Sequence, residues 1–299
     1  MPRKIVYLIN PISGTKGKSS LQELIARRTK ALGIDFEIVA TNASGDYGFL
    51  RQKIIKERIT DAVICGGDGT ASAVASSLMG VNVNIGIIPM GSGNGLALAA
   101  KIPTQPSKAL DIIFAGKASF IDGFYVNNEF SCMLCGIGFD ALVAHEFAKQ
   151  KKRGLQAYIK VAAINFFKTS PYPFEVRLKN KSLAVDAFFI CIANGNQFGN
   201  NFTIAPKASL RDGLIDIVIV KKMSKFLLPF SVINQVSGIN GVQNINDYAK
   251  KKHIIYFQTQ SLTIHNLSEA PMHIDGDPKK TSASFDIRVV PKALKLIQP

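Results

Sequence analysis

The stretch Ile64-Cys65-Gly66-Gly67-Asp68-Gly69-Thr70 leads from an apolar run into a helical pattern through a turn that contains three glycines. The apolar run 61–65 predicts a buried strand, and residues 70–79 predict a helix. Glycine permits positive φ angles and lets backbone N–H groups approach an anion, and the N-terminal end of a helix attracts negative charge. The stretch therefore predicts a phosphate-binding turn in an α/β sheet. The plain alternative is a strand–helix turn in which Asp68 is the N-cap.

The charge of Asp68 points to a metal ion. Its carboxylate would repel a phosphate unless a divalent cation lay between the two anions, and Mg²⁺ prefers oxygen ligands. Asp68 is therefore a candidate for handling magnesium beside a nucleotide.

Two other turns of similar composition follow apolar runs. Gly91-Ser92-Gly93-Asn94-Gly95 comes after the run 85–89, and residues 10–18, with two glycines and two lysines, come after the run 4–9. Parallel strands place their C-terminal ends along one edge of a sheet, so we expect these turns to converge on one ligand. The turn at 10–18 does not match a Walker A loop, because Ile12 stands where that loop has its first glycine.

The order of the expected elements indicates two domains. Up to about residue 115, short strand-like runs alternate with helical patterns, which is typical of a parallel sheet covered by helices. From about residue 117, strand candidates dominate, with helical interruptions near 140–167 and 224–236. We therefore expect a Rossmann-like α/β domain over residues 1–116 and a β-rich domain over residues 117–288. The expected strands are 4–9, 36–40, 61–65, 85–89, 120–126, 130–137, 174–178, 184–193, 214–220, 254–257, 261–265 and 284–290.

The composition describes a folded chain with a basic surface. Hydrophobic residues make up 47% of the 299 positions, and 36 basic against 21 acidic residues give a net charge of +15. Such a charge favours polyanionic partners, including nucleic acid, anionic lipid and phosphorylated ligands. The four cysteines all lie in apolar runs and are expected to be buried, reduced thiols. They are Cys65, Cys132, Cys135 and Cys191.

The apolar runs also bear on the expected location of the protein. The run after Arg3 is too short for a secretory signal, and no run approaches the ~20 residues of a membrane-spanning helix. We expect a cytoplasmic protein whose contact with a membrane is peripheral.

Taken together, the motifs resemble those of the diacylglycerol kinase catalytic-domain family, which includes bacterial lipid kinases, sphingosine kinases and ceramide kinases. The resemblance covers nearly the whole chain. It implies a nucleotide-binding domain followed by a β-sandwich, with ATP bound between them and the segment 289–299 returning to the first domain. The motifs that carry it are Asn10-Pro11-Ile12-Ser13-Gly14, Thr41 with Ser44-Gly45-Asp46, residues 66–70, residues 91–97, Ile121-Asp122-Gly123, Arg211-Asp212-Gly213-Leu214 and Asp275-Gly276-Asp277.

The same resemblance implies a set of binding residues. Residues expected to contact ATP or its magnesium are Asn10, Thr41, Gly66, Gly67, Asp68, Gly69, Thr70, Ser92, Gly93 and Asn94. A structural Mg²⁺ would be held by the backbone of Ser209 and Leu214 and by the carboxylate of Asp212. Without the resemblance, Asp212-Gly213 is a plain turn between strands.

The general base of the family lies in an Asp-Gly-Glu motif, which here is Asp275-Gly276-Asp277. Asp277 takes the place of the glutamate, and Asp275 and Asp68 complete the candidate catalytic set. Phosphoryl transfer uses a carboxylate to accept the proton of the attacking hydroxyl, while the metal neutralises phosphate charge. Because aspartate is one methylene shorter, a closer backbone, a bridging water and an impaired enzyme are all left open.

Two other departures concern the acceptor. Diacylglycerol kinases usually have aspartate where Gly95 stands, and the family commonly has Asn-Glu where this chain has Ser72-Ala73. The acceptor is therefore left open between a diacylglycerol-like lipid and a sphingoid or ceramide-like lipid.

The basic run 149–153 precedes an apolar helical pattern with Tyr158, Phe166 and Phe167. Lysines beside an amphipathic helix are attracted to anionic lipid, which favours this segment as a contact with an anionic membrane surface. The alternative is a core-packed helix with a solvated basic turn.

Two alternative functions remain beside the lipid kinase hypothesis, and the place of His273 is also open. An NAD kinase shares the motif at 66–70, although Leu96-Ala97 fits lipid kinases better. A basic nucleic-acid or membrane-binding module finds no specific nucleic-acid motif and no tryptophan to support it. His273 either lines the acceptor pocket or is a hydrogen-bonded core histidine. The sequence thus predicts an ATP- and magnesium-dependent lipid kinase acting in lipid metabolism, such as phospholipid biosynthesis, with a homodimer left open.

Overall fold

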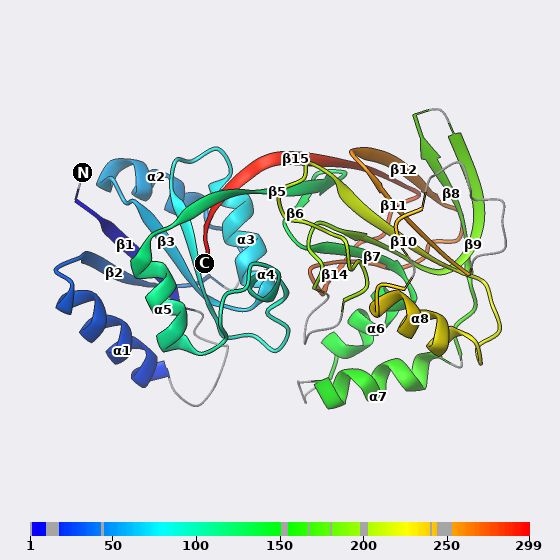
Figure 1. Cartoon of the computed structure of the whole chain (residues 1–299), viewed down its shortest axis with the longest axis horizontal. Helices are drawn as coiled ribbons and strands as arrows, with labels where there is room; N and C mark the ends of the chain where they lie inside the picture. The colour runs from blue at the N-terminus through cyan, green and yellow to red at the C-terminus, as the bar shows by residue number, and fades with distance from the viewer. Residues whose placement is uncertain are drawn as a thin grey trace. The chain divides into compact units, whose positions relative to one another are not determined.

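The computed structural model describes residues 2–9, 18–42, 45–150, 155–166, 168–179, 181–197, 203–239, 241–243 and 253–299. The chain divides into two compact units, Met1–Ile121 with Lys292–Pro299, and Asp122–Pro291. The chain leaves the first unit within strand β5 (Ala118–Val126) and returns to it within strand β15 (Ser284–Ile297) (Figure 1).

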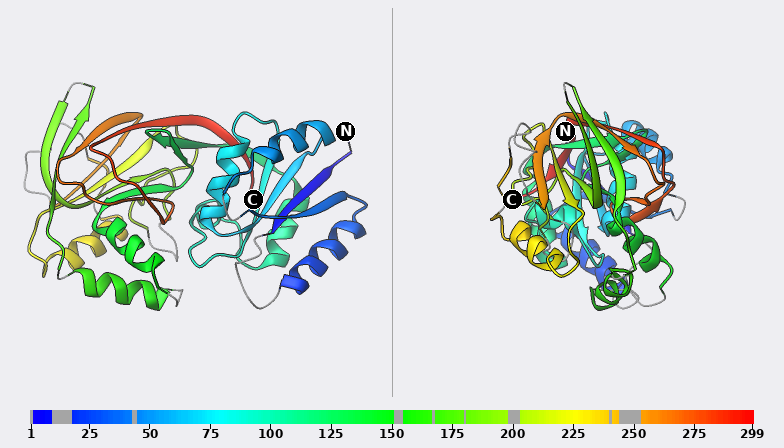
Figure 2. Two further views of the ribbon diagram at one scale, coloured as in Figure 1. Left: turned by 180° about the vertical axis from the view of Figure 1, so that it is seen from behind. Right: turned by 90° about the vertical axis from the view of Figure 1, so that its right-hand side faces the viewer.

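The first unit is a parallel sheet between two layers of helices, which confirms the predicted α/β fold. Its strand order is β2-β1-β3-β4, and the end of β15 adds a further parallel strand beside β4. Figures 1 and 2 show α1 and α5 on one side of these strands and α2 and α3 on the other. The elements are β1 (Lys4–Ile9), α1 (Lys18–Ala31), β2 (Asp35–Ala40), α2 (Gly48–Glu57), β3 (Asp61–Gly66), α3 (Asp68–Leu78), β4 (Asn84–Pro89), α4 (Gly95–Ala99) and α5 (Pro106–Ala115).

The central strands are apolar because helices cover both of their faces. Every residue of β3 is buried, and β1 and β4 are buried after their first residue. Such continuous apolar runs are typical of parallel sheets, whereas a sheet with one face in water alternates apolar and polar residues.

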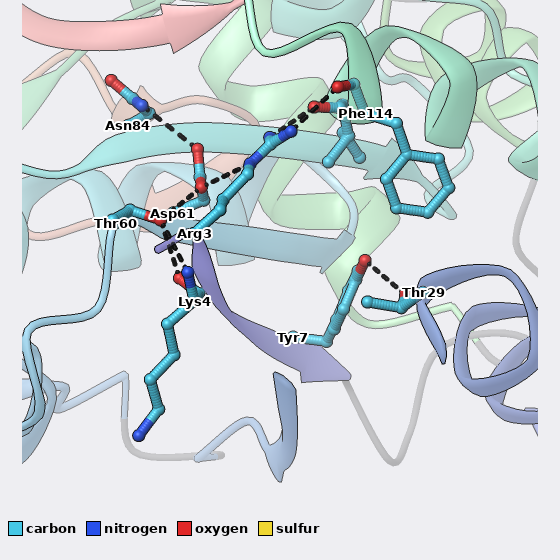
Figure 3. Close-up of polar contacts among 9 residues, drawn as sticks. Arg3, Lys4, Tyr7, Thr29, Thr60, Asp61, Asn84 and Phe114 are labelled. Carbon is cyan, nitrogen blue, oxygen red and sulfur yellow. Dashed lines mark hydrogen bonds and ion pairs between the residues drawn. The ribbon is translucent and has the colours of Figure 1, made fainter. Parts of the chain in front are cut away.

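A buried ion pair ties together the N-terminal ends of these strands (Figure 3). The Arg3 guanidinium donates through Nε to Asp61 Oδ2 at 2.8 Å and also donates to the carbonyls of Ile113 and Phe114 at the end of α5. Asn84 at the start of β4 donates to the other Asp61 oxygen at 3.1 Å. The buried carboxylate is therefore balanced by a cation and by hydrogen bonds, as burial of charge requires. The glycine turns lie at the opposite ends of the same strands.

The second unit is a β-sandwich, as predicted, and its described residues include the helices α6, α7 and α8. Its long strand β9 pairs with β7, β8 and β10, and the strand path runs β14-β13-β7-β9-β8-β12-β15. Buried aromatic and aliphatic side chains from these strands form one core, including Phe124, Phe174, Phe257 and Phe285. The elements are β6 (Glu129–Ser131), β7 (Leu134–Gly138), α6 (Phe139–Ala148), α7 (Leu155–Phe166), β8 (Tyr172–Leu178), β9 (Lys181–Ala193), β10 (Ile215–Lys221), α8 (Leu228–Val236), β11 (Ile254–Thr259), β12 (Ser261–Asn266), β13 (Met272–Ile274) and β14 (Asp277–Lys279).

Two local expectations need correction. The single strand expected at 130–137 is two strands, because the chain breaks between Ser131 and Leu134 and the second part pairs with β9 and β13. The short hairpin formed by β13 and β14 was not expected at all. The prediction for the four cysteines is confirmed, since all are buried and free. In the part of the chain that the structure describes, every helix is too short or too polar to cross a membrane.

Candidate active site

The first glycine turn is a direct junction between strand and helix. Gly66 is the last residue of β3, Gly67 is the N-cap of α3, and Asp68 is the first helical residue. The positive end of the helix dipole therefore lies at the carboxyl end of a central strand, which is a favourable place for an anion. Gly69 and Thr70 lie in the first turn of the same helix.

The second glycine turn is closed by its own asparagine. Asn94 Oδ1 accepts a hydrogen bond from the backbone N–H of Gly91 at 2.9 Å, and Asn94 Nδ2 donates to the carbonyl of Gly91 at 2.8 Å. Asn94 adopts the left-handed conformation with φ 54°, and α4 begins at Gly95. The amide of Asn94 thus holds the shape of the turn, with Ser92 exposed and Gly93 partly exposed within it.

The two turns lie side by side, as expected for neighbouring parallel strands. The N–H of Met90 donates to the carbonyl of Gly66 at 2.9 Å. Asp68 Oδ1 accepts a longer hydrogen bond, 3.4 Å, from the N–H of Leu96 in α4. Asp68 therefore connects the start of α3 to the start of α4.

One of the two reasons that the sequence suggested for the glycines, a positive φ angle, is wrong. None of the glycines in residues 66–70 and 91–95 has a positive φ angle. Glycine is needed there because two backbones touch: a Cβ added to Gly91 would lie 2.6 Å from the Cα of Gly67, and one added to Gly67 would lie 3.0 Å from the Cα of Gly91. Close approach, and not an unusual backbone angle, excludes larger residues.

Thr41 lies at the same edge of the sheet, directly after β2. Its N–H donates to the carbonyl of Ile9, the last residue of β1, at 3.0 Å, and the residue is buried. Burial raises the pKa of Tyr47, while a side-chain hydrogen bond with Thr41 opposes that rise. The Tyr47 hydroxyl also donates to the carbonyl of Asn42 at 3.4 Å. Asn10, with the rest of the turn at 10–17, and Ser44 lie outside the described residues.

In the second unit, Asp275-Gly276 forms the two-residue turn between β13 and β14. Both residues have positive φ, 52° and 84°, and Ile274 pairs with Asp277 across the turn. Positive φ at both central positions is the requirement of a type I′ hairpin turn, and Asp-Gly is one of its preferred sequences. Asp275 is buried and Asp277 is exposed, so the two carboxylates of the motif have different surroundings.

The carboxylate of Asp275 is held by a distant part of the chain. Its Oδ1 accepts hydrogen bonds from the hydroxyl of Ser131 at 2.8 Å and from the N–H of Leu134 at 3.0 Å. These donors flank the break between β6 and β7, at 144 and 141 positions from Asp275 in the sequence. The break that splits the predicted strand 130–137 therefore supplies the anchor for the turn.

His273 supports the same turn from inside. Its Nδ1 accepts a hydrogen bond from the N–H of Gly276 at 3.2 Å, which leaves the proton on Nε2, and Nε2 lies 3.4 Å from Asp140 Oδ2 at the start of α6. Gly136 on β7 leaves room for this pair, since an added Cβ would overlap both Asp140 and His273. The buried, paired histidine fits the core-residue alternative and not a pocket lining.

The residues expected to hold a structural magnesium lie around a second acidic side chain. Asp122 on β5 is buried, and its Oδ2 accepts a hydrogen bond from the N–H of Gly213 at 2.7 Å, next to Asp212. Loss of hydration, and then repulsion by the Asp122 carboxylate, raise the pKa of Asp212, although this residue is exposed. Ser209 and Leu214 flank Asp212, whose Oδ1 accepts from the N–H of Leu214 at 3.1 Å.

The sequence analysis missed several of these supporting residues. The Asp-Gly pair between Met272-His273-Ile274 and Asp277-Pro278-Lys279 is a hairpin signal that could have located β13 and β14. Asp122 was quoted only as part of a motif, and nothing near it in the sequence connects it to Asp212. The partners Ser131 and Asp140 carry no local signal for their contacts with the turn.

The aromatic side chains of the predicted membrane segment are used for packing. Tyr158 of α7 contacts Phe147 of α6 with ring centroids 5.5 Å apart, and Phe166 contacts Phe139 at 6.0 Å. Burial raises the pKa of Tyr158 well above its ordinary value. These contacts favour the core-packed alternative for the aromatic residues of α7, while residues 151–154 and 167 lie outside the described part.

The chain matches two family models that together span most of its length. Residues 4–126 match the diacylglycerol kinase catalytic domain, and residues 134–298 match the YegS C-terminal NAD kinase β-sandwich-like domain. The boundary between the matches falls inside the second unit, just after β5.

Relatives of similar length also resemble the whole chain. A protein of Salmonella typhimurium (strain LT2) named "Probable lipid kinase YegS" is 31% identical over 277 residues, covering 89% of this chain and 87% of that protein. A Shewanella frigidimarina protein named "Probable lipid kinase YegS-like" is 27% identical over 285 residues, covering 93% and 88%. The crystal structure of a diacylglycerol kinase from Bacillus anthracis shares the fold with a TM-score of 0.73 at 16% identity, covering 99% of this chain and 97% of that chain.

The family resemblance suggested by the sequence motifs is confirmed by these matches. Its α/β catalytic domain and its β-sandwich both have the expected architecture. The chain therefore belongs to the diacylglycerol kinase and YegS family of lipid kinases.

Proposed function

We propose that this lipid kinase transfers the terminal phosphate of ATP to a hydroxyl group of a membrane lipid, with magnesium and with Asp277 as the general base. The observation that carries the proposal is the contact between the turns 66–70 and 91–95, with Asp68 at the start of α3 and bonded to α4. The helices α3 and α4 both begin at the carboxyl-terminal edge of the sheet. Their positive dipole ends and backbone N–H groups suit a polyphosphate.

Asp277 and Asp275 have separate roles in this proposal. One carboxylate oxygen of Asp275 accepts hydrogen bonds from Ser131 and Leu134, and these bonds fix the turn. Asp277 is exposed on the first residue of β14 and can accept a proton from a hydroxyl. The type I′ turn fixes the backbone that carries Asp277, which limits how far this shorter side chain can move.

The acidic pair Asp122 and Asp212 fits a bound Mg²⁺. Besides loss of hydration, repulsion by the Asp122 carboxylate helps to raise the pKa of Asp212. A divalent cation between the two carboxylates would relieve that repulsion, and oxygen ligands completed by water suit magnesium. Among the described residues, however, no group of three histidine, cysteine or acidic side chains gathers as a metal site. A magnesium held by Asp212 with backbone oxygens of Ser209 and Leu214 would supply fixed positive charge beside β5, and Asp68 would hold a second one that neutralises phosphate charge.

Transfer of labelled phosphate from ATP to a panel of acceptors tests the proposal. The panel contains diacylglycerol, a sphingoid base, ceramide and NAD, with and without Mg²⁺. We expect one lipid to be labelled in the presence of Mg²⁺ and NAD to remain unlabelled. Labelling of NAD alone would replace the lipid kinase assignment by the NAD kinase alternative.

Three aspartate variants assign the roles. We expect Asp68→Ala and Asp277→Ala each to lower the rate of transfer by about 100-fold or more, as loss of a metal ligand or of a general base does. Asp35→Ala is the control, because Asp35 lies at the start of β2, at the opposite edge of the sheet. If both test variants retain the rate of the wild type, the site assignment is wrong.

A further inference from the structure

Exposed apolar side chains are concentrated in one short part of the second unit. Of the eleven large hydrophobic residues that are exposed in the described part of the chain, five lie within residues 226–242. They are Phe226, Leu227, Ile233, Ile239 and Val242. We call these five residues the α8 patch, since they lie on and around helix α8, which Figures 1 and 2 show at the periphery of the second unit.

The helix at the centre of the patch buries a polar residue and exposes an apolar one. Gln235 is fully buried and donates through Nε2 to the carbonyl of Ile204 at 2.9 Å, whereas Ile233 is 60% exposed. Phe226, in the turn before α8, is 83% exposed. A helix in contact with water normally buries its apolar residues, so the exposure of Ile233 together with Phe226 suits an apolar environment outside the protein.

The patch is anchored, and this fixes which side faces outward. Gly238 packs near Pro206, and the N–H of Gln243 donates to the carbonyl of Tyr256 in β11 at 2.7 Å. The polar contacts at Gln235 and Gln243 therefore connect α8 and its C-terminal flank to the body of the unit. The apolar side chains remain on the other side.

The charge around the patch selects the partner. Lys221, Lys222 and Lys225 precede the helix, and no acidic residue occurs between Asp216 and Asp247. An apolar surface with three lysines directly before it in the chain complements anionic lipid headgroups over a hydrocarbon layer. This cationic segment favours an anionic bilayer over another protein as the partner.

We propose that the α8 patch is the surface by which this lipid kinase binds an anionic phospholipid bilayer, with Phe226 and Ile233 inserted below the headgroups and the three lysines at their level. The inference rests on the proposed function only in that a lipid acceptor resides in a bilayer. Binding itself requires neither ATP nor the acceptor. The patch differs from the segment 149–168, in which Tyr158 and Phe166 pack on α6.

Cosedimentation with vesicles tests the proposal without any catalytic step. The vesicles contain phosphatidylcholine alone or with roughly one third phosphatidylglycerol, a fraction that gives a negative surface potential. We expect the double variant Phe226→Ser, Ile233→Ser to lower the partition coefficient on the anionic vesicles by about tenfold or more, because both inserting side chains are lost.

A matched control exists in the first unit. Phe49 and Ile55 on α2 are also exposed, at 47% and 67%, so Phe49→Ser, Ile55→Ser removes the same two residue types elsewhere. This control lowers the exposed hydrophobicity of the chain in the same way but leaves the α8 patch intact. We therefore expect it to bind within about twofold of the wild type. Equal losses in both double variants would overturn the assignment to the α8 patch.

Tryptophan substitution provides a second readout that does not depend on removing contacts. The chain has no tryptophan, so Phe226→Trp creates a single fluorophore on the patch, and Phe49→Trp creates one on α2. Anionic vesicles should shift the emission of the first to shorter wavelength and leave the second unchanged. An unshifted emission of the Phe226→Trp variant contradicts the proposal even if its fold is intact.

Two outcomes separate this inference from its competitors. If the double variant at the patch changes the oligomeric state in solution and binds vesicles as the wild type does, the patch is a contact between protein copies and the inference is wrong. If vesicle binding depends on the patch but no lipid is phosphorylated, the proposed function fails and the membrane surface stands.

Discussion

The glycine turns of the first unit carry the candidate phosphate-binding residues, and the Asp-Gly turn of the second unit carries the candidate general base. The two kinds of turn are held in place by different contacts. Gly67 and Gly91 are placed by the register of two adjacent parallel strands, and the second turn is closed by Asn94 within its own sequence. The turn at Asp275 is held by Ser131, more than a hundred residues away. Sequence motifs thus reveal turns that neighbouring residues build and say little about the support of a turn that distant residues build.

The largest expected effect comes from forcing the two glycine turns apart. In Gly91→Ala, the new Cβ meets the backbone of Gly67. Backbone atoms cannot move aside by changing rotamer as a side chain can. We expect a loss of about 4 kcal/mol in the free energy of unfolding, above the usual 1–3 kcal/mol of overpacking. Transfer activity should fall by about 100-fold, since a shift of about 1 Å in bound groups costs that much.

Chemical denaturation and an ATP-dependent transfer assay measure the two effects in Gly91→Ala. Gly241→Ala serves as the control, because an added Cβ at Gly241 meets nothing within 4 Å. Wild-type stability in Gly91→Ala would mean that the turns separate without cost.

The next effect concerns the anchor of the Asp-Gly turn. Asp275→Ala removes the acceptor of the Ser131 and Leu134 hydrogen bonds and places alanine at a φ of 52°. A hydrogen bond to a charged group contributes about 1.5–3 kcal/mol, and the left-handed angle costs alanine about 1 kcal/mol more, so we expect a loss of about 3 kcal/mol in stability.

Asp275→Asn then separates anchoring from chemistry, with thermal unfolding and transfer rate measured on the same sample. Asparagine keeps an accepting oxygen and tolerates the same φ, so stability should be largely retained. A positioning role predicts that the transfer rate of Asp275→Asn stays within about tenfold of the wild type, a margin equal to ~1.4 kcal/mol. A much greater loss of rate at unchanged stability would make Asp275 a chemical participant.

A smaller loss of stability is expected where an added Cβ meets side chains, which can move, and not backbone. In Gly136→Ala the added Cβ overlaps Asp140 and His273, both of which can turn away at a cost. We expect a loss of about 2 kcal/mol in stability, within the range for overpacking. Combination with Asp140→Ala should recover part of this loss in a double-mutant cycle. Strict additivity of the two substitutions would show that the pair does not meet Gly136.

The smallest expected effect is a dependence of stability on pH through Asp216 in β10. Burial raises the pKa of Asp216 to about 6, while hydrogen bonds from Tyr256 and Gln258 oppose the rise. Because the folded-state pKa exceeds the unfolded-state value of about 4, the contribution to stability is complete below pH ~4 and is lost as pH rises through ~6. Two pKa units correspond to about 2.7 kcal/mol, of which about 2 kcal/mol is expressed between pH 4 and pH 7.

Denaturation measured between pH 4 and pH 7 tests this contribution. Asp216→Asn should remove it and flatten the profile over that interval. An unaltered profile in the variant would assign the dependence to other groups.

The sequence predicted the parallel order of the first unit well because each strand and turn there carries its own signal. The continuous apolar runs 61–65 and 85–89 became β3 and β4, and the turns after them became neighbours. The positive φ angles expected for the glycines were not found, and the approach of Gly67 to Gly91 was not expected because it is a contact between two turns. A sequence shows that glycine is present and does not show what a side chain would strike.

The second unit was predicted less completely, because its site depends on contacts across the sandwich. The break at Ser131 looks like continuous strand in the sequence, and its function as a donor appears only when Asp275 is beside it. The α8 patch was hidden for a similar reason. The exposure of Ile233 and the burial of Gln235 depend on how the helix packs in the fold.

The sequence by itself determined the family, the two kinds of domain and the motifs at which chemistry is expected, since these follow from local pattern and from residue type. Only the tertiary structure decided that Gly67 must be glycine, that Asp275 is an anchor while Asp277 is exposed, and that Ile233 of α8 is exposed while Gln235 is buried. Burial and the identity of a distant hydrogen-bond partner are properties of the folded chain, because they depend on which segments meet and not on the order of residues within one segment.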